Sequence, residues 1–312
     1  MKVVYLIQTH QNLEQIQRLV QTIQRSSHTS RILISHDFSC GLDLKPLGQT
    51  LGIEVLNAKG GRGDFSTTQG YLDAVQWLLE HQIEFDWLIN LSGQDYPTQP
   101  LPKIEKFLAQ TQYEGLIEYF EVLSPQSQWR IHEGHSRYFY QYWRSGYDLE
   151  EWQRLCIKPF RILFNYIQPW LRLNSSYSLM LGTRAKVPFN DSFRCYGGSH
   201  FKTLSRKCAE FVYESAQQNP DLVRYYQRTC VPEESFMQTV LVNSGRFKLC
   251  NDPKRYFDFL GSQDGRPRVL TAQDYPTLSQ DNIHFARKFD LRQDRQIFDL
   301  LDARILQGAL SS

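Results

Sequence analysis

The sequence lacks the features that mark several large classes of protein. Its 35 basic and 33 acidic residues leave a formal net charge of +2, which provides no strong field for binding nucleic acid. The apolar stretch before Gln8 is too short for a signal peptide or a membrane span. The six cysteines include no C-x-x-C pair, which disfavours a zinc site or a thioredoxin-type motif. We therefore expect a cytoplasmic protein with reduced thiols.

Several motifs of common enzyme classes are also missing. There is no G-x-x-x-x-G-K-[ST], no G-x-G-x-x-G after a strand, no H-E-x-x-H and no G-x-S-x-G. No two aspartates are separated by one residue, so the D-x-D metal clamp of many sugar-nucleotide enzymes is missing as well. A metal site is therefore not expected.

Short apolar runs alternate with helical patterns along the first hundred residues. This alternation predicts βαβ units and an α/β fold with a mostly parallel central sheet flanked by helices. The expected strands are 3–7, 31–35, 53–56 and 87–91, and the expected helices are 13–23 and 67–80. Ligands of such sheets bind beyond the carboxyl ends of the strands, where Thr9, His10 and Asp37 lie.

The middle of the chain is less regular and rich in aromatic residues. Residues 157–173 interleave apolar and basic side chains, which predicts an amphipathic helix bracketed by Pro159 and Pro169. Packing on the core is the favoured role of this helix, and contact with a membrane interface is the alternative. No linker divides the sequence, so we expect one domain over 1–312. Residues 1–112 would form its nucleotide-binding half, and 113–190 an aromatic-rich insertion on the acceptor side. Residues 191–312 would form the catalytic, diphosphate-binding half.

Three segments present polar groups that suit a ligand site. Residues 88–97 run from an apolar strand into a turn that carries Asp95, although this carboxylate could simply cap the turn. Residues 195–201 contain a Gly-Gly-Ser turn that allows close backbone approach to a ligand. Pro232 opens a predicted helix with Glu233 and Glu234 in its first turn, where both glutamates could only complement the helix dipole.

Cations near the C-terminus form a fourth candidate group. Four cations, Arg266, Arg268, Arg287 and Lys288, fall within about two dozen residues of one another. They could hold a diphosphate, or they could be solvated surface charges.

Taken in order, these segments resemble glycosyltransferase family 14, which contains the core-2/I-branching β-1,6-N-acetylglucosaminyltransferases and the peptide O-xylosyltransferases. The resemblance is carried by residues 3–10, 65–66, 90–97, 197–201, 232–236 and 285–290. It implies a GT-A type fold, a UDP-sugar donor, inversion at the anomeric carbon, and no divalent cation or other cofactor. The membrane anchor and stem of eukaryotic members are not found, which predicts a bacterial-type, soluble member.

The resemblance also assigns roles to individual residues. It places the catalytic base at Glu234 and a diphosphate-binding lysine at Lys288, with Arg266 and Arg268 as candidates for the second phosphate-binding cation. The remaining expected substrate contacts are Thr9, His10 and Asp37 around the uridine, Asp95, Gly197, Gly198 and Ser199 around the sugar, and an aromatic acceptor platform of Trp129, Tyr138 and Trp143.

The sequence leaves the substrates open. The donor is expected to be UDP-GlcNAc or UDP-xylose, and the acceptor a glycan, glycolipid or peptide, with no nucleic-acid partner. The alternative function is a non-catalytic carbohydrate- or nucleotide-binding protein on the same fold. The alternative location is a peripheral position at the inner face of the membrane.

Overall fold

The computed structural model describes residues 1–61, 63–145, 149–175, 178–260 and 266–309 of the chain. Within these residues a seven-stranded sheet has the order β13-β6-β12-β4-β1-β2-β3. Its strands are β1 (Val3–Thr9), β2 (Arg31–Asp37), β3 (Glu54–Ala58), β4 (Trp87–Ser92), β6 (Gly115–Leu116), β12 (Thr203–Ser205) and β13 (Leu249–Cys250). Only β12 runs antiparallel to its neighbours in this described sheet.

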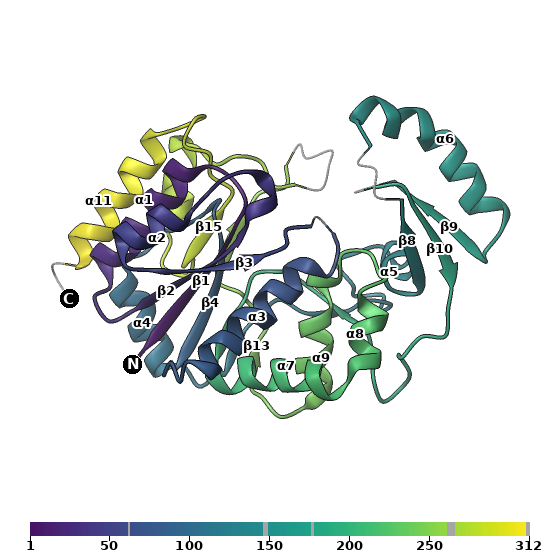
Figure 1. The fold of residues 1–312 in the computed structure, drawn as a ribbon, viewed down its shortest axis with the longest axis horizontal. Coiled ribbons are helices and arrows are strands. Elements are labelled where there is room, and N and C mark those ends of the chain that lie inside the picture. The colour runs from purple at the N-terminus through teal and green to yellow at the C-terminus, as the bar shows by residue number, and fades with distance from the viewer. Residues whose placement is uncertain (62, 146–148, 176–177, 261–265, 310–312) are drawn as a thin grey trace.

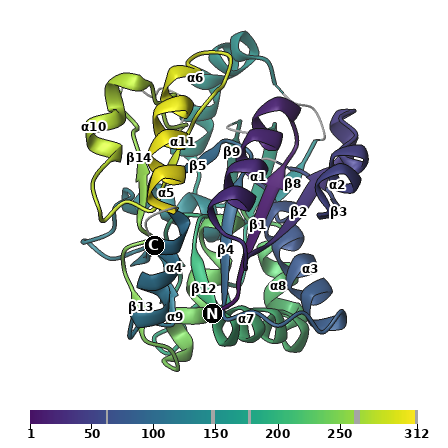
Figure 2. The ribbon, with the colours of Figure 1, turned by 90° about the vertical axis from the view of Figure 1, so that its left-hand side faces the viewer.

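Helices cover both faces of the sheet (Figure 1). One face carries α1 (Leu13–Ser26), α4 (Leu101–Gln110) and α11 (Gln296–Ala309), and the other carries α3 (Ser66–Glu80), α7 (Arg206–Gln218) and α9 (Phe236–Ser244). Figure 2 shows α1 and α11 side by side over their face. The predicted fold class, an α/β fold with a mostly parallel central sheet flanked by helices, is confirmed, and its GT-A type stays a prediction.

The sequence of β1 explains why both faces are covered. Tyr5 and Ile7 point into the core under α1, whereas Val4 and Leu6 point into the core under α3, and all four are buried. Successive side chains of a strand face opposite sides, so a continuous apolar strand requires a cover on each side. The predicted strands and helices of the first hundred residues are confirmed, with ends that move by a few residues.

Smaller elements complete the body. Beyond the carboxyl ends of the central strands lies a three-stranded sheet of β14 (Arg255–Phe257), β15 (Phe285–Arg287) and β5 (Asp95–Pro97). A two-stranded sheet joins β11 (Tyr196–Gly197) to β7 (Phe120–Glu121). The short helices are α2 (Lys45–Leu51), α8 (Pro220–Tyr226) and α10 (Tyr275–Leu278), and the 3-10 turns are η1 (Phe38–Cys40), η2 (Pro232–Glu234) and η3 (Ala272–Asp274).

A small lobe lies beside the body, at the right of Figure 1. It follows α5 (Ile131–Tyr138) and contains a three-stranded sheet, with the helix α6 (Glu151–Ile167) along its edge strand β9. The strands of this sheet are β8 (Tyr140–Arg144), β10 (Met180–Arg184) and β9 (Leu171–Asn174). Tyr140, Tyr142 and Met180 pack on Cys230 and Val231, which joins the lobe to the segment before η2.

The helix predicted over residues 157–173 differs from the observed α6. It begins earlier, because Glu150 and Gln153 form a reciprocal capping box, and it ends at Ile167. Pro159 lies inside the helix. The expected packing of this helix on the core is wrong, since its large apolar side chains are exposed. The division at residues 112 and 190 stays a prediction.

Among the described residues, no helix is both long enough and apolar enough to cross a lipid bilayer.

Candidate active site

Two adjoining cavities open beyond the carboxyl ends of the central strands. The strand-end cavity, of about 590 Å³, is lined by Thr9, His10 and Asp37, as the topology predicts. The glutamate cavity, of about 370 Å³, is lined by Glu234 and Trp129. Both volumes fall in the range of small-molecule sites. The residues that line both cavities are Thr67, His200, Phe201, Glu233, Arg266, Pro267 and Arg287.

Hydrogen bonds hold the polar groups of the strand-end cavity in place. Thr9 Oγ1 lies 2.8 Å from His36 Nδ1, and Asp37 accepts a 2.9 Å hydrogen bond from Ser39 N. Burial acts to raise the pKa of Asp37, but the hydrogen bonds from Ser39 outweigh it and the pKa is lowered. Burial lowers the pKa of His10, although Asp37 opposes the shift. The cavity thus offers an ionised carboxylate beside a neutral imidazole.

Cations from the C-terminal third form the wall shared by the two cavities. Arg266 and Arg287 line both cavities, and Lys288 lines the strand-end cavity. Arg287 belongs to the group of cations that the sequence offers for a diphosphate, although the family resemblance gives it no individual role. Its guanidinium carbon lies 4.2 Å from the centre of the Phe201 ring, which fixes its direction.

Two residues predicted to bind substrate have other partners. Asp95 lies opposite Arg287 in the β5–β15 pair, accepts a 2.6 Å hydrogen bond from Ser92 N, and is 3.4 Å from Arg287 Nε. Asp95 lines neither of the two cavities and instead contacts Arg287 on the side away from them. The structure therefore gives no support to the expected contact of Asp95 with the sugar. Arg268 forms ion pairs with Asp258 and Asp274, outside both cavities, so Arg266 is the better placed of the two arginines.

The turn that carries the two glutamates has an unusual backbone. Val231 has a φ of +56°, which a β-branched residue rarely adopts. Its N–H donates to Gly63 O at 3.1 Å and its carbonyl accepts from Tyr138 Oη at 2.9 Å. The single helix expected from Pro232 is instead the 3-10 turn η2, separated from α9 by Ser235 in a non-helical conformation. Surrounding contacts thus fix the direction of both carboxyl groups.

The Gly-Gly-Ser turn packs directly against this segment. Gly198 N donates to Glu234 O at 2.9 Å, and a Cβ at Gly198 would lie 1.9 Å from Glu118 O. A Cβ at Gly197 would lie 2.5 Å from the Trp129 ring. Gly198 and Ser199 line the glutamate cavity, whereas Gly197 lies behind Trp129. The glycines therefore let the chain pass close to its neighbours.

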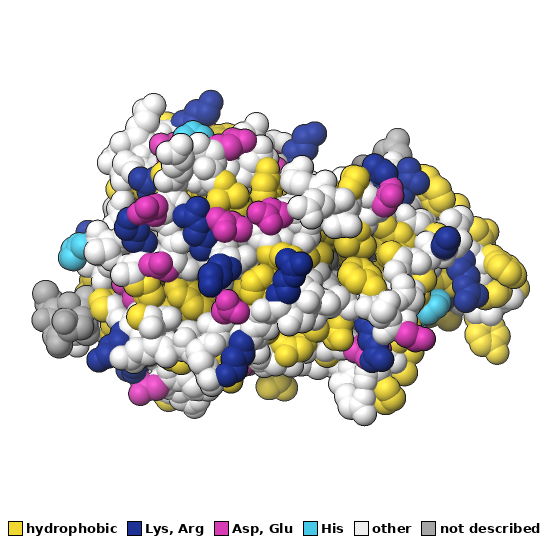
Figure 3. All heavy atoms as spheres, turned by 90° about the horizontal axis from the view of Figure 1, so that it is seen from below, with side chains coloured by type: hydrophobic (Ala, Val, Ile, Leu, Met, Phe, Trp, Pro, Cys, Tyr) yellow, Lys and Arg dark blue, Asp and Glu magenta, His cyan; other side chains and the backbone are white. Residues whose placement is uncertain are grey.

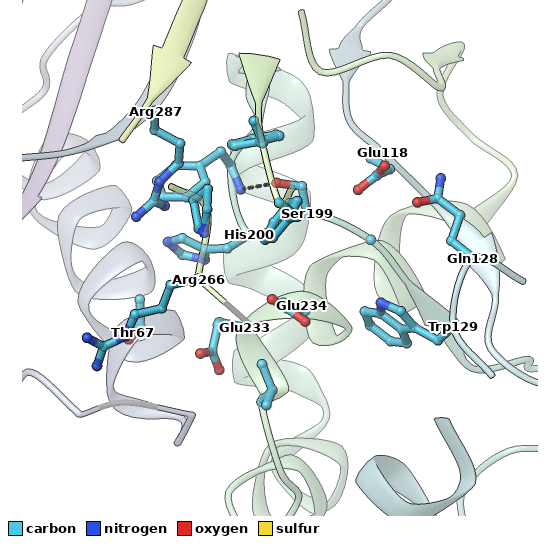
Figure 4. Close-up of a pocket in the computed structure, with 16 residues that line it drawn as sticks. Thr67, Glu118, Gln128, Trp129, Ser199, His200, Glu233, Glu234, Arg266 and Arg287 are labelled. Carbon is cyan, nitrogen blue, oxygen red and sulfur yellow. Dashed lines mark hydrogen bonds between the residues drawn. The ribbon is translucent and has the colours of Figure 1, made fainter. Parts of the chain in front are cut away.

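Of the predicted acceptor platform, Trp129 lies at the glutamate cavity. Tyr138 is fully buried and Trp143 lines neither described cavity, so neither is placed to contact an acceptor there. Figure 4 shows Glu233 and Glu234 between Trp129 on one side and Arg266 and Arg287 on the other.

Arg137, which sequence reasoning missed, contacts Glu234 from α5. Its Nη1 donates to Glu234 Oε2 at 2.8 Å, and its guanidinium carbon lies 4.3 Å from the centre of the Trp129 ring. Burial raises the pKa of Glu234, and the Arg137 charge opposes that rise. This hydrogen-bonded ion pair stabilises the ionised form of Glu234.

Glu233 has a different environment. Burial, followed by the charge of Glu234, raises its pKa to about 8, and its Oε2 has no hydrogen-bond partner among the described residues. Near neutral pH Glu233 is therefore protonated, whereas Glu234, whose pKa burial also raises, has a cation partner that favours its ionised form. Buried carboxyls with perturbed pKa values are typical of acid–base sites.

Two further buried basic side chains, Lys202 and His200, lie near the glutamates. Lys202 is 1% exposed, and burial lowers its pKa to about 7 against the attraction of Glu233. His200 Nε2 lies 2.9 Å from Gln8 Oε1, and burial lowers the pKa of His200. No cluster of three or more His, Cys, Asp or Glu suited to a metal occurs in the described part of the chain. Metal independence stays a prediction.

The amino-acid sequence of the chain is similar to that of known proteins. Residues 152–279 match the family model of the Core-2/I-Branching enzymes. Beta-glucuronosyltransferases GlcAT14A and GlcAT14B of Arabidopsis thaliana are 26% and 23% identical to the chain over 239 residues, which cover 75% of the chain and 46% and 47% of those proteins. These matches confirm the resemblance to the core-2/I-branching family and support a role in glycosyl transfer.

The matches cover only part of the relatives and of the chain. The chain spans about half the length of the curated relatives it matches. A solved structure of 4-diphosphocytidyl-2C-methyl-D-erythritol synthase covers 41% of the chain and 64% of its own length, with 11% identity and a TM-score of 0.29, which is too low to support any conclusion.

The raised pKa of Glu233 predicts a distinct dependence of stability on pH. The folded state retains a proton that the unfolded state loses at a pKa of 4.5, so this stabilisation is complete below 4.5 and lost as the pH rises to about 8. Glu233→Gln should lack this decline. In urea unfolding at a series of pH values, the variant should gain stability relative to the parent as the pH rises. Parallel profiles would contradict the assignment, and the exposed Glu214→Gln is the control.

Proposed function

We propose that the chain is an inverting glycosyltransferase that moves a sugar from a UDP-sugar to an acceptor hydroxyl, with Glu234 as the general base. The observation that carries this proposal is the junction of the two cavities. Glu234 lies at the cavity that holds Trp129, while Arg266 and Arg287 lie on the wall shared with the strand-end cavity. A direct displacement requires a base on the acceptor side and positive charge on the side of the leaving group.

The difference between the two glutamates supports Glu234 as the base. A general base must be ionised before it can accept the proton of the acceptor hydroxyl. The Arg137 ion pair favours the ionised form of Glu234, whereas Glu233, with a pKa of about 8, is protonated near neutral pH. Glu233 therefore suits a different task, that of a hydrogen-bond donor to the donor sugar or its phosphate.

The cations suit the departing diphosphate. Arg266, Arg287 and Lys288 all line the strand-end cavity, so the pyrophosphate would lie along them with the uridine toward Thr9, His10 and Asp37. Fixed guanidinium and ammonium groups stabilise the developing negative charge, which is the task that a metal ion has in other enzymes. We infer that the reaction proceeds without a divalent cation.

The proposal also concerns the identity of the donor sugar. UDP-GlcNAc and UDP-xylose follow from the family resemblance, and the names of the matched relatives add UDP-glucuronate. Arg287 at the shared wall offers a cation that could contact a glucuronate carboxylate. The acceptor is a glycan, glycolipid or peptide hydroxyl that reaches Trp129.

The first test is a panel of donors. Thermal-shift and UDP-release assays with UDP-GlcNAc, UDP-xylose and UDP-glucuronate should identify one donor that stabilises the chain and is turned over, with equal rates in millimolar EDTA. Loss of turnover in EDTA and its recovery with manganese would overturn the metal-free mechanism. Binding of a donor without any turnover would favour the non-catalytic alternative.

The second test separates the cations. Arg266→Ala and Lys288→Ala should each weaken UDP binding by roughly 2 to 4 kcal/mol, the usual cost of removing one partner of a desolvated charge pair. Arg268→Ala is the matched control, since Arg268 is paired with Asp258 and Asp274 away from the cavities. Calorimetry in which Arg268→Ala weakens UDP as much as Lys288→Ala would refute this placement of the diphosphate.

The third test compares the two glutamates. Glu234→Gln should lower kcat by at least about a hundredfold with UDP binding intact, which is the usual size of a general-base contribution. Glu233→Gln keeps a hydrogen-bond donor at the position of a protonated carboxyl and should stay within about tenfold of the parent. Equal losses in the two variants, or near-normal turnover in Glu234→Gln, would show that Glu234 is not the base.

A further inference from the structure

The helix α6 exposes an unusually large apolar surface. None of the described side chains from residue 152 to residue 170 is fully buried, and Tyr166 is 88% exposed. Large exposed apolar patches mark interaction sites. The exposed large apolar residues of this segment are Trp152, Leu155, Phe160, Ile162, Leu163, Tyr166, Ile167 and Trp170.

The polar side of α6 faces its own lobe. Asn165 both donates to Leu173 O at 2.9 Å and accepts from Leu173 N at 2.8 Å, which fastens the helix to β9. Arg161 Nη1 donates to Ser175 Oγ at 2.9 Å. A helix on the surface of a globular protein normally turns its apolar stripe toward the core. In α6 the orientation is reversed.

The spacing of the exposed residues defines a single outward face. Successive helical residues are rotated by about 100°, so Leu155, Ile162 and Tyr166 lie within about 40° of one another. Arg161 and Asn165 lie about 120° and about 80° around the helix from Leu155, on the side where they contact Ser175 and β9. Figure 3 shows hydrophobic side chains gathered at the right-hand end of the molecule, the end at which the small lobe lies in Figure 1.

The segment around this face carries charge of one sign. Residues 152–190 contain no Asp or Glu, although the chain as a whole has nearly equal numbers of acidic and basic residues. The basic residues of this segment are Arg154, Lys158, Arg161, Arg172, Arg184 and Lys186. An apolar face rich in Trp, Phe and Leu with basic flanks is the composition of helices that lie in a membrane interface.

We propose that α6 docks this lobe on an anionic lipid surface, with the helix parallel to the membrane plane. The apolar face would enter the boundary between headgroups and acyl chains, and the exposed Lys158, Arg184 and Lys186 would contact the headgroups. Charge argues against a second copy of the chain as the occupant. A symmetric dimer through α6 would bring two sets of these cations together, and the acidic residues of the helix and its N-cap, Glu151 and Glu150, are confined to its N-terminal end.

Docking would also orient the candidate active site. Tyr140, Tyr142 and Met180 of the lobe pack on Cys230 and Val231, immediately before the turn that carries Glu233 and Glu234. The lobe therefore keeps a defined position relative to the glutamate cavity when it binds a surface.

The test is flotation of the full chain with lipid vesicles. The parent should float with vesicles of phosphatidylglycerol and phosphatidylcholine, and high salt should reduce this binding because it screens the basic flanks. Phosphatidylcholine vesicles should bind much less. The double variant Ile162→Glu with Tyr166→Glu should lose at least about tenfold of the binding, because two charges then enter the apolar face.

Matched controls separate docking from folding and from catalysis. Leu13→Glu places the same charge on an exposed apolar position of α1, outside the lobe, and should float like the parent. Glu234→Gln should also float normally, so the outcome does not depend on the proposed enzymatic activity. The Ile162→Glu and Tyr166→Glu variant should keep its unfolding midpoint and its UDP affinity.

Three outcomes would overturn the proposal. The parent could fail to float with anionic vesicles, or the double variant could bind them as well as the parent does. Sedimentation without lipid could also show a dimer that the double variant dissociates, which would assign the apolar face to a second copy of the chain.

Discussion

The ion pair between Arg137 and Glu234 links the parts of the candidate site. Arg137 comes from α5 and contacts Glu234 at 2.8 Å, and its backbone carbonyl accepts from Cys230 N at 3.0 Å. Its guanidinium also lies over the Trp129 ring. One residue therefore positions the proposed base and the aromatic wall of its cavity, and its charge opposes the rise in the pKa of Glu234 that burial causes.

Buried positive charge behind the shared wall is the second constraint. Arg255 and Arg287 are both close enough to Asp95 for its charge to favour their ionised forms. Arg255 Nε has no hydrogen-bond partner among the described residues, and neither has Lys202 Nζ. Burial of positive charge is offset by nearby anions. Of these residues Arg287 lines the described cavities, where its charge faces a negatively charged ligand such as a diphosphate.

The sequence predicted the parts that depend on local pattern. The βαβ half follows from apolar periodicity, and the strand ends place Thr9, His10 and Asp37 at the strand-end cavity. Arg137 could not be found in this way, because it meets Glu234 only through tertiary packing across 97 residues. Asp95 and Arg268 look like ligand residues by type, yet their charges are used in internal ion pairs. The outward face of α6 reverses the usual rule for amphipathic helices.

The central claim is that two adjacent glutamates differ in protonation because only one of them pairs with Arg137. Carbon-13 NMR of side-chain-labelled glutamate, assigned with Glu233→Gln and Glu234→Gln, measures this directly. The account predicts a Glu233 that titrates at about 8 and a Glu234 that loses its proton at a lower pH, because the Arg137 charge opposes the effect of burial. Arg137→Met should shift the titration of Glu234 upward. Two glutamates that titrate together near 4.5, the ordinary value, would contradict the account.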